Sequence, residues 1–399
     1  MLKLTDKIKL YKSILSTDIW KVKPSLIIFL WQYLRKFEIR KVSDKYIIHS
    51  HLPPLNSKPY RRFISEFLVN KQDSLSHAQI GVTNVCPMNC DFCYNKDRKG
   101  TSLDTKKIIK TIDELKELGI IWIGLTGGEP LLNDDIVKIV DSIGDKICSK
   151  LFTSGYGLTE KLADDLKKAG LDYVSVSLDH GKEEEFDYIR GYKGAYQTAL
   201  KAIEIFKKKD FHVSVSTVLT RSMIDTKKIK SFMDFLISLG VDEAWLSEVK
   251  PSCKSFWDSE NIITEKEKNM LIDFQDLFNK KGDITVNYLG HFEGKENFGC
   301  SAGNRMLYVD SFGEVSPCVF TPCTFGNVQK SNLKDIYREM KTYFPTEDSC
   351  FINKNYKLFD KYSQGALPLS RERTIELMDE VEFGPLSRFF RIFIGEDQE

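Results

Sequence analysis

The chain has 399 residues, which is enough for one large domain with smaller additions. Its 58 basic side chains nearly balance its 57 acidic ones, so no strong field favours nucleic acid, and none is expected as a partner. Its nine cysteines are odd in number and gather in clusters, which indicates metal ligation in a reducing cytoplasm rather than disulfide bonds.

Residues 1–75 are expected to form an N-terminal extension that is mainly helical, with an extended stretch near 45–49. The start of the chain shows no secretory signal pattern. The longest apolar run, residues 25–34, is about half as long as a bilayer requires, so no transmembrane helix is predicted. Because basic residues flank this run and it contains Trp31 and Tyr33, it either packs on the main domain or makes a peripheral membrane contact.

A regular alternation begins near residue 78, where short apolar strands are followed by amphipathic helices. The first helix places Ile108, Ile112 and Leu115 on one face, and Gly119 follows it as a C-cap. Such alternation requires a parallel sheet with right-handed crossovers, in a doubly wound α/β sheet or a partial barrel. The six expected strands are 78–83, 120–125, 150–153, 173–178, 211–219 and 243–247.

Two motifs follow the first two strands. Cys86, Cys90 and Cys93 form a CxxxCxxC pattern, in which three thiolates can bind three irons of a four-iron cluster and leave the fourth iron open. Zinc is the alternative, but a structural zinc site needs four ligands, and this loop offers three and no nearby histidine. The run Gly127-Gly128-Glu129-Pro130 offers a glycine-lined backbone edge and a carboxylate to a small polar ligand.

Together the two motifs resemble the radical S-adenosylmethionine (SAM) superfamily in order and spacing. The resemblance implies a six-unit partial (β/α)6 barrel with its ligand at the carboxyl ends of the strands. It also implies that Cys86, Cys90 and Cys93 hold a [4Fe-4S] cluster and that SAM binds the open iron. Reductive cleavage of SAM would then give a 5'-deoxyadenosyl radical, with reduced flavodoxin or ferredoxin as the electron donor.

Further site residues follow from the same resemblance. Phe92 takes the position that touches adenine, and Glu129 takes the position that contacts the SAM amino group. Arg190 either contacts the SAM carboxylate or braces the cysteine loop, and Asp179 faces either SAM or the substrate. The full set of expected SAM-binding residues is Phe92, Tyr94, Gly127, Gly128, Glu129, Ser154, Ser177, Asp179 and Arg190.

Two cysteines stand apart from the clusters. Cys253 follows the sixth strand near the expected barrel mouth, where a thiol can donate a hydrogen atom to a substrate radical, so it is a candidate catalytic residue. An inert thiol is the alternative. Cys148 lies at the opposite end of its strand and is expected to be inert.

A second cysteine group lies beyond the barrel. The spacing of Cys300, Gly313 and Cys318 indicates a hairpin with strands at 306–310 and 314–316, in which Gly313 supplies a positive φ. This segment resembles the SPASM extension of radical SAM enzymes or its shorter relative, twitch. The resemblance implies one auxiliary [4Fe-4S] cluster, since the dense cysteine run of a full SPASM domain is missing; structural zinc is the alternative. Its expected ligands are Cys300, Cys318, Cys323 and Cys350.

The expected domains are the extension (1–75), the radical SAM core (76–290), the twitch or SPASM-like region (291–365) and a helical tail (366–399). Relatives with this extension mostly modify peptides, so the expected function is hydrogen abstraction from a peptide or protein during maturation, oxidation or crosslinking. The alternative is a lipid or small molecule at a membrane surface, suggested by the apolar segments 21–36 and 386–394. A non-catalytic iron-sulfur or zinc protein is the competing class. A cobalamin-dependent enzyme is excluded, because residues 1–75 are too short for the extra domain.

Overall fold

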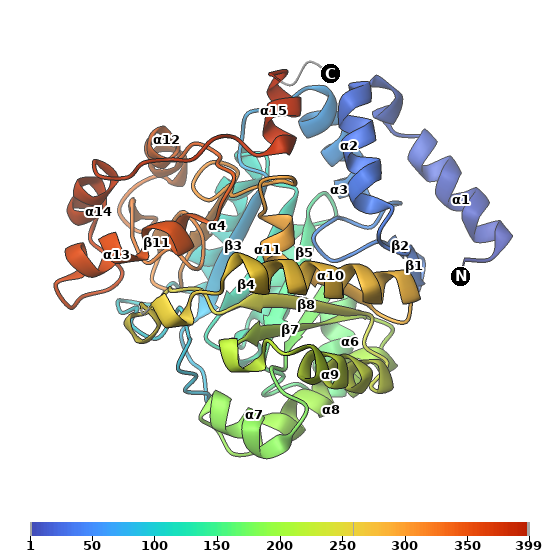
Figure 1. Ribbon diagram of the computed structural model, residues 1–399, viewed down its shortest axis with the longest axis horizontal. Helices are drawn as coiled ribbons and strands as arrows, with labels where there is room; N and C mark the ends of the chain where they lie inside the picture. Colours follow the sequence, from blue (N-terminus) through green and yellow to red (C-terminus); the bar gives the residue numbers. More distant parts are fainter. Residues whose placement is uncertain (1, 258, 397–399) are drawn as a thin grey trace.

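A mixed ten-stranded sheet forms the centre of the computed structural model, which describes residues 2–257 and 259–396 (Figure 1). The strand order is β12-β11-β10-β3-β4-β5-β6-β7-β8-β9, and every neighbouring pair from β10 to β9 is parallel. The parallel strands are β3 (His77–Thr83), β4 (Trp122–Gly127), β5 (Cys148–Thr153), β6 (Tyr173–Ser177), β7 (His212–Leu219), β8 (Glu243–Glu248), β9 (Thr285–Tyr288) and β10 (Met306–Val309).

The six strand-helix units expected from the sequence are present in β3 to β8, and the partial barrel is confirmed. The first helix shows why it forms, because Ile108, Ile112 and Leu115 are fully buried and Asp104 caps its start by accepting a 2.8 Å hydrogen bond from the Lys107 backbone. The helices that follow the strands are α4 (Thr105–Glu117), α5 (Ile136–Ile143), α6 (Glu160–Lys168), α7 (Glu183–Arg190), α8 (Ala195–Lys208), α9 (Thr226–Ser238) and α10 (Glu265–Lys281).

The C-terminal hairpin is also present as expected. β10 pairs antiparallel with β11 (Glu314–Ser316), and Gly313 adopts a φ of +89° in the turn. In addition, β10 pairs in parallel with β3, with Met306 opposite His77, so the hairpin extends the sheet of the barrel. The short strand β12 (Gly326–Asn327) and the helices α12 (Leu333–Tyr343), α13 (Phe351–Ser363) and α14 (Arg371–Met378) follow.

The N-terminal extension closes the base of the barrel. Ser50 donates its backbone N–H to Glu243 at 2.8 Å and accepts a hydrogen bond from Lys150 Nζ at 2.7 Å on its hydroxyl. Trp122 Nε1 donates to the Ser50 carbonyl at 3.2 Å, so three strands hold this one residue. The elements of the extension are α1 (Leu4–Leu15), α2 (Pro24–Leu34), β1 (Arg40–Val42), β2 (Lys45–Ile47), α3 (Lys58–Arg62) and a π-helical turn (Phe63–Val69).

The two apolar terminal segments meet in a second, smaller core. Helix α2 lies beside α15 (Arg388–Ile394), near the C-terminal end of the chain (Figure 1). The centre of the Phe29 ring lies 5.5 Å from the centre of the Phe389 ring and 5.4 Å from that of Phe298, so the three rings pack together. One face of α2 therefore packs internally. Within the described chain, none of the helices has the length and apolar character needed to span a membrane.

Candidate functional site

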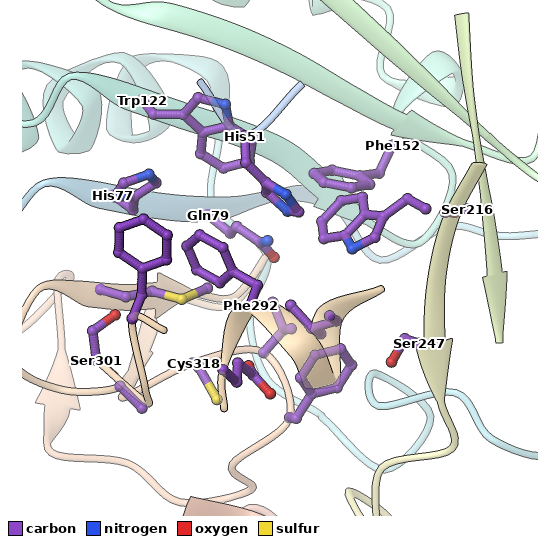
Figure 2. A pocket seen from close by; sticks show the side chains of 18 of the residues that line it. His51, His77, Gln79, Trp122, Phe152, Ser216, Ser247, Phe292, Ser301 and Cys318 are labelled. Carbon is purple, nitrogen blue, oxygen red and sulfur yellow. The ribbon is translucent and has the colours of Figure 1, made fainter. Parts of the chain in front are cut away.

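A cavity of about 580 Å³ opens at the carboxyl ends of the barrel strands and continues into the barrel interior. Figure 2 shows His77 and Gln79 of β3, His51 of the extension and Cys318 of the C-terminal region around the same space. Both cysteine groups contribute to its walls. The cysteines that line it are Cys86, Cys90, Cys93, Cys300, Cys318 and Cys350.

The first cysteine group lies in the loop after β3. Cys86 is exposed, Cys93 is half-buried and Cys90 is buried, and all three are free thiols. Although Cys86 as a whole residue is exposed, partial desolvation of its thiol raises its pKa to about 11, and burial raises the pKa of Cys93. Both thiols are therefore protonated at neutral pH until a metal displaces the proton, as is usual for cysteine ligands.

The two glycines at the end of β4 allow this loop to lie close to the sheet. A Cβ atom on Gly127, whose φ is +123°, would lie 2.3 Å from the Thr83 carbonyl oxygen, and one on Gly128 would lie 2.3 Å from that of Val85. The Gly128 backbone donates to Thr83 O at 2.7 Å, and the Glu129 backbone donates to Val85 O at 2.7 Å. The glycines are required for the contact between β4 and the cysteine loop.

Glu129 is 1% exposed, and its carboxylate is held by the next strand. Oε1 accepts from the Thr153 hydroxyl at 2.6 Å and from the Leu131 backbone at 3.1 Å. Oε2 accepts from the backbone and the hydroxyl of Ser154 at 2.7 and 2.5 Å. Burial raises the pKa of Glu129 although these bonds oppose the shift. The acid and Ser154 thus form one unit in the cavity wall, and a ligand ammonium would meet a carboxylate that is already oriented.

Arg190, the last residue of α7, braces the cysteine loop. Its guanidinium lies 3.7 Å from Cys90 Sγ, 2.5 Å from Asp179 Oδ2 and 5.5 Å from the Phe92 ring. Asp179 is buried behind the arginine, and its other oxygen accepts from the Val218 backbone at 2.8 Å. These contacts match the brace, and because Arg190 also lines the cavity, its expected contact with the SAM carboxylate stays a prediction. Asp179 does not line the cavity.

The remaining expected contacts divide between the cavity wall and its surroundings. Tyr94 lines the cavity, its hydroxyl lies 2.5 Å from Thr126 Oγ1, and burial raises its pKa to about 12. Ser177, at the end of β6, also lines the cavity. Cys253 does not, since its thiol lies 3.5 Å from the backbone oxygen of Asp91 on the cysteine loop. Its role as a hydrogen donor stays a prediction.

The second cysteine group lies at the hairpin and at the start of α13. Cys300 is tied to Glu347 by two backbone hydrogen bonds, and Cys350 is the N-cap residue of α13. Burial raises the pKa of Cys350 to about 12, and burial together with the charges of Cys350 and its neighbours raises the pKa of Cys300 well above its ordinary value. Cys323 is buried and does not line the cavity, but it lies close enough to Cys318 for their charges to interact.

Two buried cations at this site were missed by sequence reasoning. Lys250 lines the cavity and donates to Glu248 at 2.9 Å and to Glu293 at 3.0 Å. Glu248 is the last residue of β8. Ser154 and Ser177 were selected as polar residues at strand ends, and the same criterion applied to β8 would have found Glu248 and the nearby Lys250. Arg98 pairs with Asp310 at 3.0 Å in the interior, and this contact between distant parts of the chain has no sequence signal.

The side chains that line the cavity suit an iron-sulfur cluster. Thiolates are its usual ligands, and six free thiols from two groups face one cavity. Among the residues with described positions, no group of three or more His, Cys, Asp or Glu side chains is close enough to hold a single metal ion. In a four-iron cluster each thiolate binds a separate iron, so its ligands stand further apart than those of one ion. The donor set fits a cluster.

Two family descriptions match the sequence. The radical SAM superfamily matches residues 80–236, and the SPASM iron-sulfur cluster-binding domain matches residues 300–356. Among curated proteins, the chain is 27% identical over 297 residues to the AdoMet-dependent heme synthase of Methanosarcina barkeri, covering 67% of this chain and 83% of that protein. It is 26% identical over 275 residues to the PqqA peptide cyclase of Methylocella silvestris, covering 64% and 72%.

Solved structures share the fold. Streptococcus suis SuiB bound to its precursor peptide SuiA aligns with a TM-score of 0.56 at 15% identity, covering 79% of this chain and 78% of that one. Native anSMEcpe with bound AdoMet and the Cp18Cys peptide aligns with a TM-score of 0.54 at 16% identity, covering 81% and 100%. These similarities extend over the barrel and beyond it.

Proposed function

Because this chain belongs to the radical SAM superfamily and carries a SPASM domain, we propose that it abstracts a hydrogen atom from an unreactive carbon of a substrate held between its two cysteine groups. It is an enzyme that uses a [4Fe-4S] cluster and SAM, and its SPASM domain binds additional iron-sulfur. The observation that carries the proposal is that thiols of both groups line one cavity. A substrate in that cavity would contact both cofactor regions.

The proposed ligands follow from the two groups. Cys86, Cys90 and Cys93 would hold the cluster that binds SAM, and Cys300, Cys318, Cys323 and Cys350 would hold one auxiliary cluster. When bound and reduced, the first cluster and SAM supply a 5'-deoxyadenosyl radical that removes the hydrogen atom. Reduced flavodoxin or ferredoxin is the proposed electron source, in a reducing cytoplasm.

The protein groups prepare the site in three ways. Gly127 and Gly128 let the cysteine loop approach the sheet, and Arg190 fixes Cys90 from the other side. Ser154 orients the Glu129 carboxylate towards the expected SAM amino group. Lys250 lies between two carboxylates close to Cys350, so it compensates negative charge there. All these groups are buried or half-buried, which strengthens their electrostatic effect.

The relatives support a peptide or protein substrate. One is named a PqqA peptide cyclase, and two of the structures with the same fold contain peptides. A peptide segment bound in the cavity would undergo maturation, oxidation or crosslinking at a carbon facing Cys86, Cys90 and Cys93.

The cavity wall supports a lipid as the second candidate. Beyond the barrel the wall is largely apolar and includes Leu30 and Trp31 of α2, Phe63 and Phe67 of the π-helical turn, and Phe390 of α15. A peptide would bring backbone N–H and C=O groups into this region without partners, which costs free energy. An acyl chain has no such groups. This apolar extension is the observation that favours the lipid.

The first experiment tests the cofactor assignment. Single Cys86→Ala, Cys90→Ala and Cys93→Ala variants are reconstituted anaerobically, and 5'-deoxyadenosine formed from SAM with dithionite is measured. Each variant should lose at least 99% of the product, because three thiolates are needed to hold the cluster. Cys148→Ala, a buried thiol outside both groups, is the control and should retain activity. Undiminished product in the three variants would overturn the assignment.

The second experiment separates the two substrate candidates. The enzyme turns over with unlabelled SAM and deuterated cell material divided into lipid and peptide fractions, and deuterium in the 5'-deoxyadenosine is read by mass spectrometry. Label from the peptide fraction alone supports a peptide or protein maturase. Label from the lipid fraction supports the lipid candidate, and label from neither excludes both.

A further inference from the structure

The N-terminal helices present an unusual concentration of exposed apolar side chains. Twelve large apolar side chains in the described residues are strongly exposed, and eight of them lie between residues 4 and 31. A soluble surface shows such residues singly, whereas a cluster marks a contact site. The cluster consists of Leu4, Ile8, Tyr11, Leu15, Trp20, Ile27, Ile28 and Trp31, and we call it the N-terminal apolar face.

Helix α1 carries apolar side chains on its outer side as well as on the side that packs against the protein. Leu4, Ile8, Tyr11 and Leu15 are spaced by four, three and four residues, so they share one side of the helix. Their exposed fractions are 74%, 47%, 64% and 70%. The side turned inward carries Leu10, which is buried in the second core, and Asp6, which is paired with Lys41 at 2.8 Å. Helix α1 forms an outer edge of the molecule beside α2, so no described element covers this side (Figure 1).

The charge around the face is strongly positive. Residues 2–36 contain eight basic and two acidic side chains, although the whole chain has a formal charge of +1. Basic side chains beside exposed tryptophans and aliphatic residues are typical of helices that lie in the plane of an anionic lipid surface. Trp20 and Trp31, which are 70% and 60% exposed, are of the kind that sits at the headgroup level.

The face is continuous with the active-site cavity. Ile27 and Trp31 belong to the exposed cluster, and both also line the cavity that contains Cys86 and Cys300. From α2 inward much of the cavity wall is apolar, through Leu30 and Phe63, to the aromatic side chains inside the barrel, although the lining also includes His49, Ser76 and Arg305. The cavity therefore reaches the surface at the exposed apolar residues.

We propose that α1, the turn Asp18–Lys21 and α2 form a membrane-binding face that sets the cavity mouth against an anionic lipid surface, so that an acyl chain enters between α2 and the π-helical turn. This inference rests on the lipid form of the proposed function. The basic side chains bind anionic headgroups, the apolar face inserts at the boundary with the acyl chains, and Trp31 lies at the entrance.

The test measures binding of the reconstituted full-length enzyme to vesicles by cosedimentation, without SAM or reductant. Vesicles contain either phosphatidylglycerol mixed with phosphatidylcholine or phosphatidylcholine alone. The test variant is Leu4→Ser/Leu15→Ser/Trp20→Ala, whose three side chains face solvent. The matched control is Tyr188→Ser/Leu277→Ser, which removes exposed apolar side chains from α7 and α10. Circular dichroism checks that every variant is folded.

The wild-type enzyme should bind the vesicles with phosphatidylglycerol, and binding should weaken as salt rises. The test variant should bind at least tenfold more weakly, and the control should stay within twofold of wild type. Equal binding by wild type and test variant would overturn the proposal. A wild-type enzyme that binds neither kind of vesicle would also overturn it. A third contrary outcome is a wild-type enzyme that binds no vesicles but forms a dimer in light scattering, with the test variant remaining a monomer.

This result is separate from the proposed function. Vesicle binding is read without turnover, so it can fail while 5'-deoxyadenosine is still produced. If the wild-type enzyme produces no 5'-deoxyadenosine, the proposed function is overturned, but the measured vesicle binding still stands.

Discussion

At the scale of single residues, the site depends on a few buried charges with defined partners. Arg190 contacts Cys90, Asp179 and Phe92 at once, which only a planar guanidinium can do in this geometry. Lys150 is fully buried at the barrel base, where it donates to Ser50 and lies 4.0 Å from the Trp245 ring centre. Both charges are held by tertiary contacts, and both give measurable predictions.

Replacing Arg190 by lysine should weaken the cysteine loop. A lysine keeps the charge but cannot reach Asp179 and Cys90 together, so we expect at least a twofold loss of iron bound by the first cluster and a changed EPR signal of its reduced form. Arg221→Lys, an exposed arginine that donates to Glu267 at 2.9 Å, is the control. Iron content and EPR spectra equal to wild type would show that Arg190 does not brace the loop.

Lys150 should make stability depend on pH. Burial lowers its pKa from 10.5 to about 7, so above pH 7 the folded protein releases a proton that the unfolded chain still holds. The contribution of Lys150 to the free energy of unfolding therefore rises with pH from about 7 towards 10.5. Relative to Lys150→Met, wild type should gain on the order of 2 kcal/mol between pH 6 and pH 9, measured by urea unfolding. A difference that is constant with pH would contradict the lowered pKa.

At the scale of elements, the contact between β4 and the cysteine loop determines where the first cluster can form. This contact requires glycine at positions 127 and 128. A Cβ atom added to either Gly127 or Gly128 would lie only 2.3 Å from a backbone carbonyl oxygen of the cysteine loop or the end of β3. The close approach of the two strand ends is thus a structural reason for both glycines of the motif.

Gly127→Ala should distinguish the clash of an added Cβ with the Thr83 carbonyl oxygen from the strain of a positive φ. Gly144→Ala is the matched control, because Gly144 also has a positive φ, +76°, but an added Cβ there meets nothing within 4 Å. The control should cost about 1 to 3 kcal/mol in urea unfolding, because its φ of +76° with a ψ of 179° is a conformation that residues other than glycine rarely adopt. Gly127→Ala should cost more and should abolish 5'-deoxyadenosine formation. Equal losses for the two variants would mean that the contact with Thr83 has no effect.

At the scale of the whole molecule, one sheet joins the barrel and the C-terminal cysteine region. β10 pairs with β3, and the buried Arg98–Asp310 ion pair connects the chain after the cysteine loop to the hairpin. Asp310 also accepts backbone hydrogen bonds from Phe312 and Glu314 at 2.9 Å, which shapes the turn. We therefore expect the two regions to unfold together.

Asp310→Asn tests this coupling. Removing one partner of a buried ion pair costs about 3 to 5 kcal/mol, because the other charge stays uncompensated. Amide hydrogen exchange should lose protection in β3 and in β10 to the same extent. Asp335→Asn, at an exposed carboxylate, is the control and should change neither. Loss of protection confined to β10 and β11 would show that the hairpin is an independent unit.

Local patterns in the sequence predicted much of the architecture. The six strands, the buried face of α4 and the turn at Gly313 follow from side-chain periodicity and backbone preference, which act over a few residues. The resemblance of the cysteine and glycine motifs to a known family gave the enzyme class. The strand β9, only four residues long, and the second partner of β10 were missed, because short strands carry little periodicity.

The sequence by itself determined the two cysteine groups and the alternation of strands and helices, since these depend on spacing along the chain, and the resemblance of its motifs to a known family gave the enzyme class and the barrel. Only the tertiary structure decided that both groups line one cavity, that Arg190 pairs with Asp179 behind the cysteine loop, and that Cys253 lies outside the wall. It also decided which side of α1 and α2 faces solvent. The physical reason is that burial and pairing depend on residues that are distant in sequence, and no local pattern records which of them become neighbours.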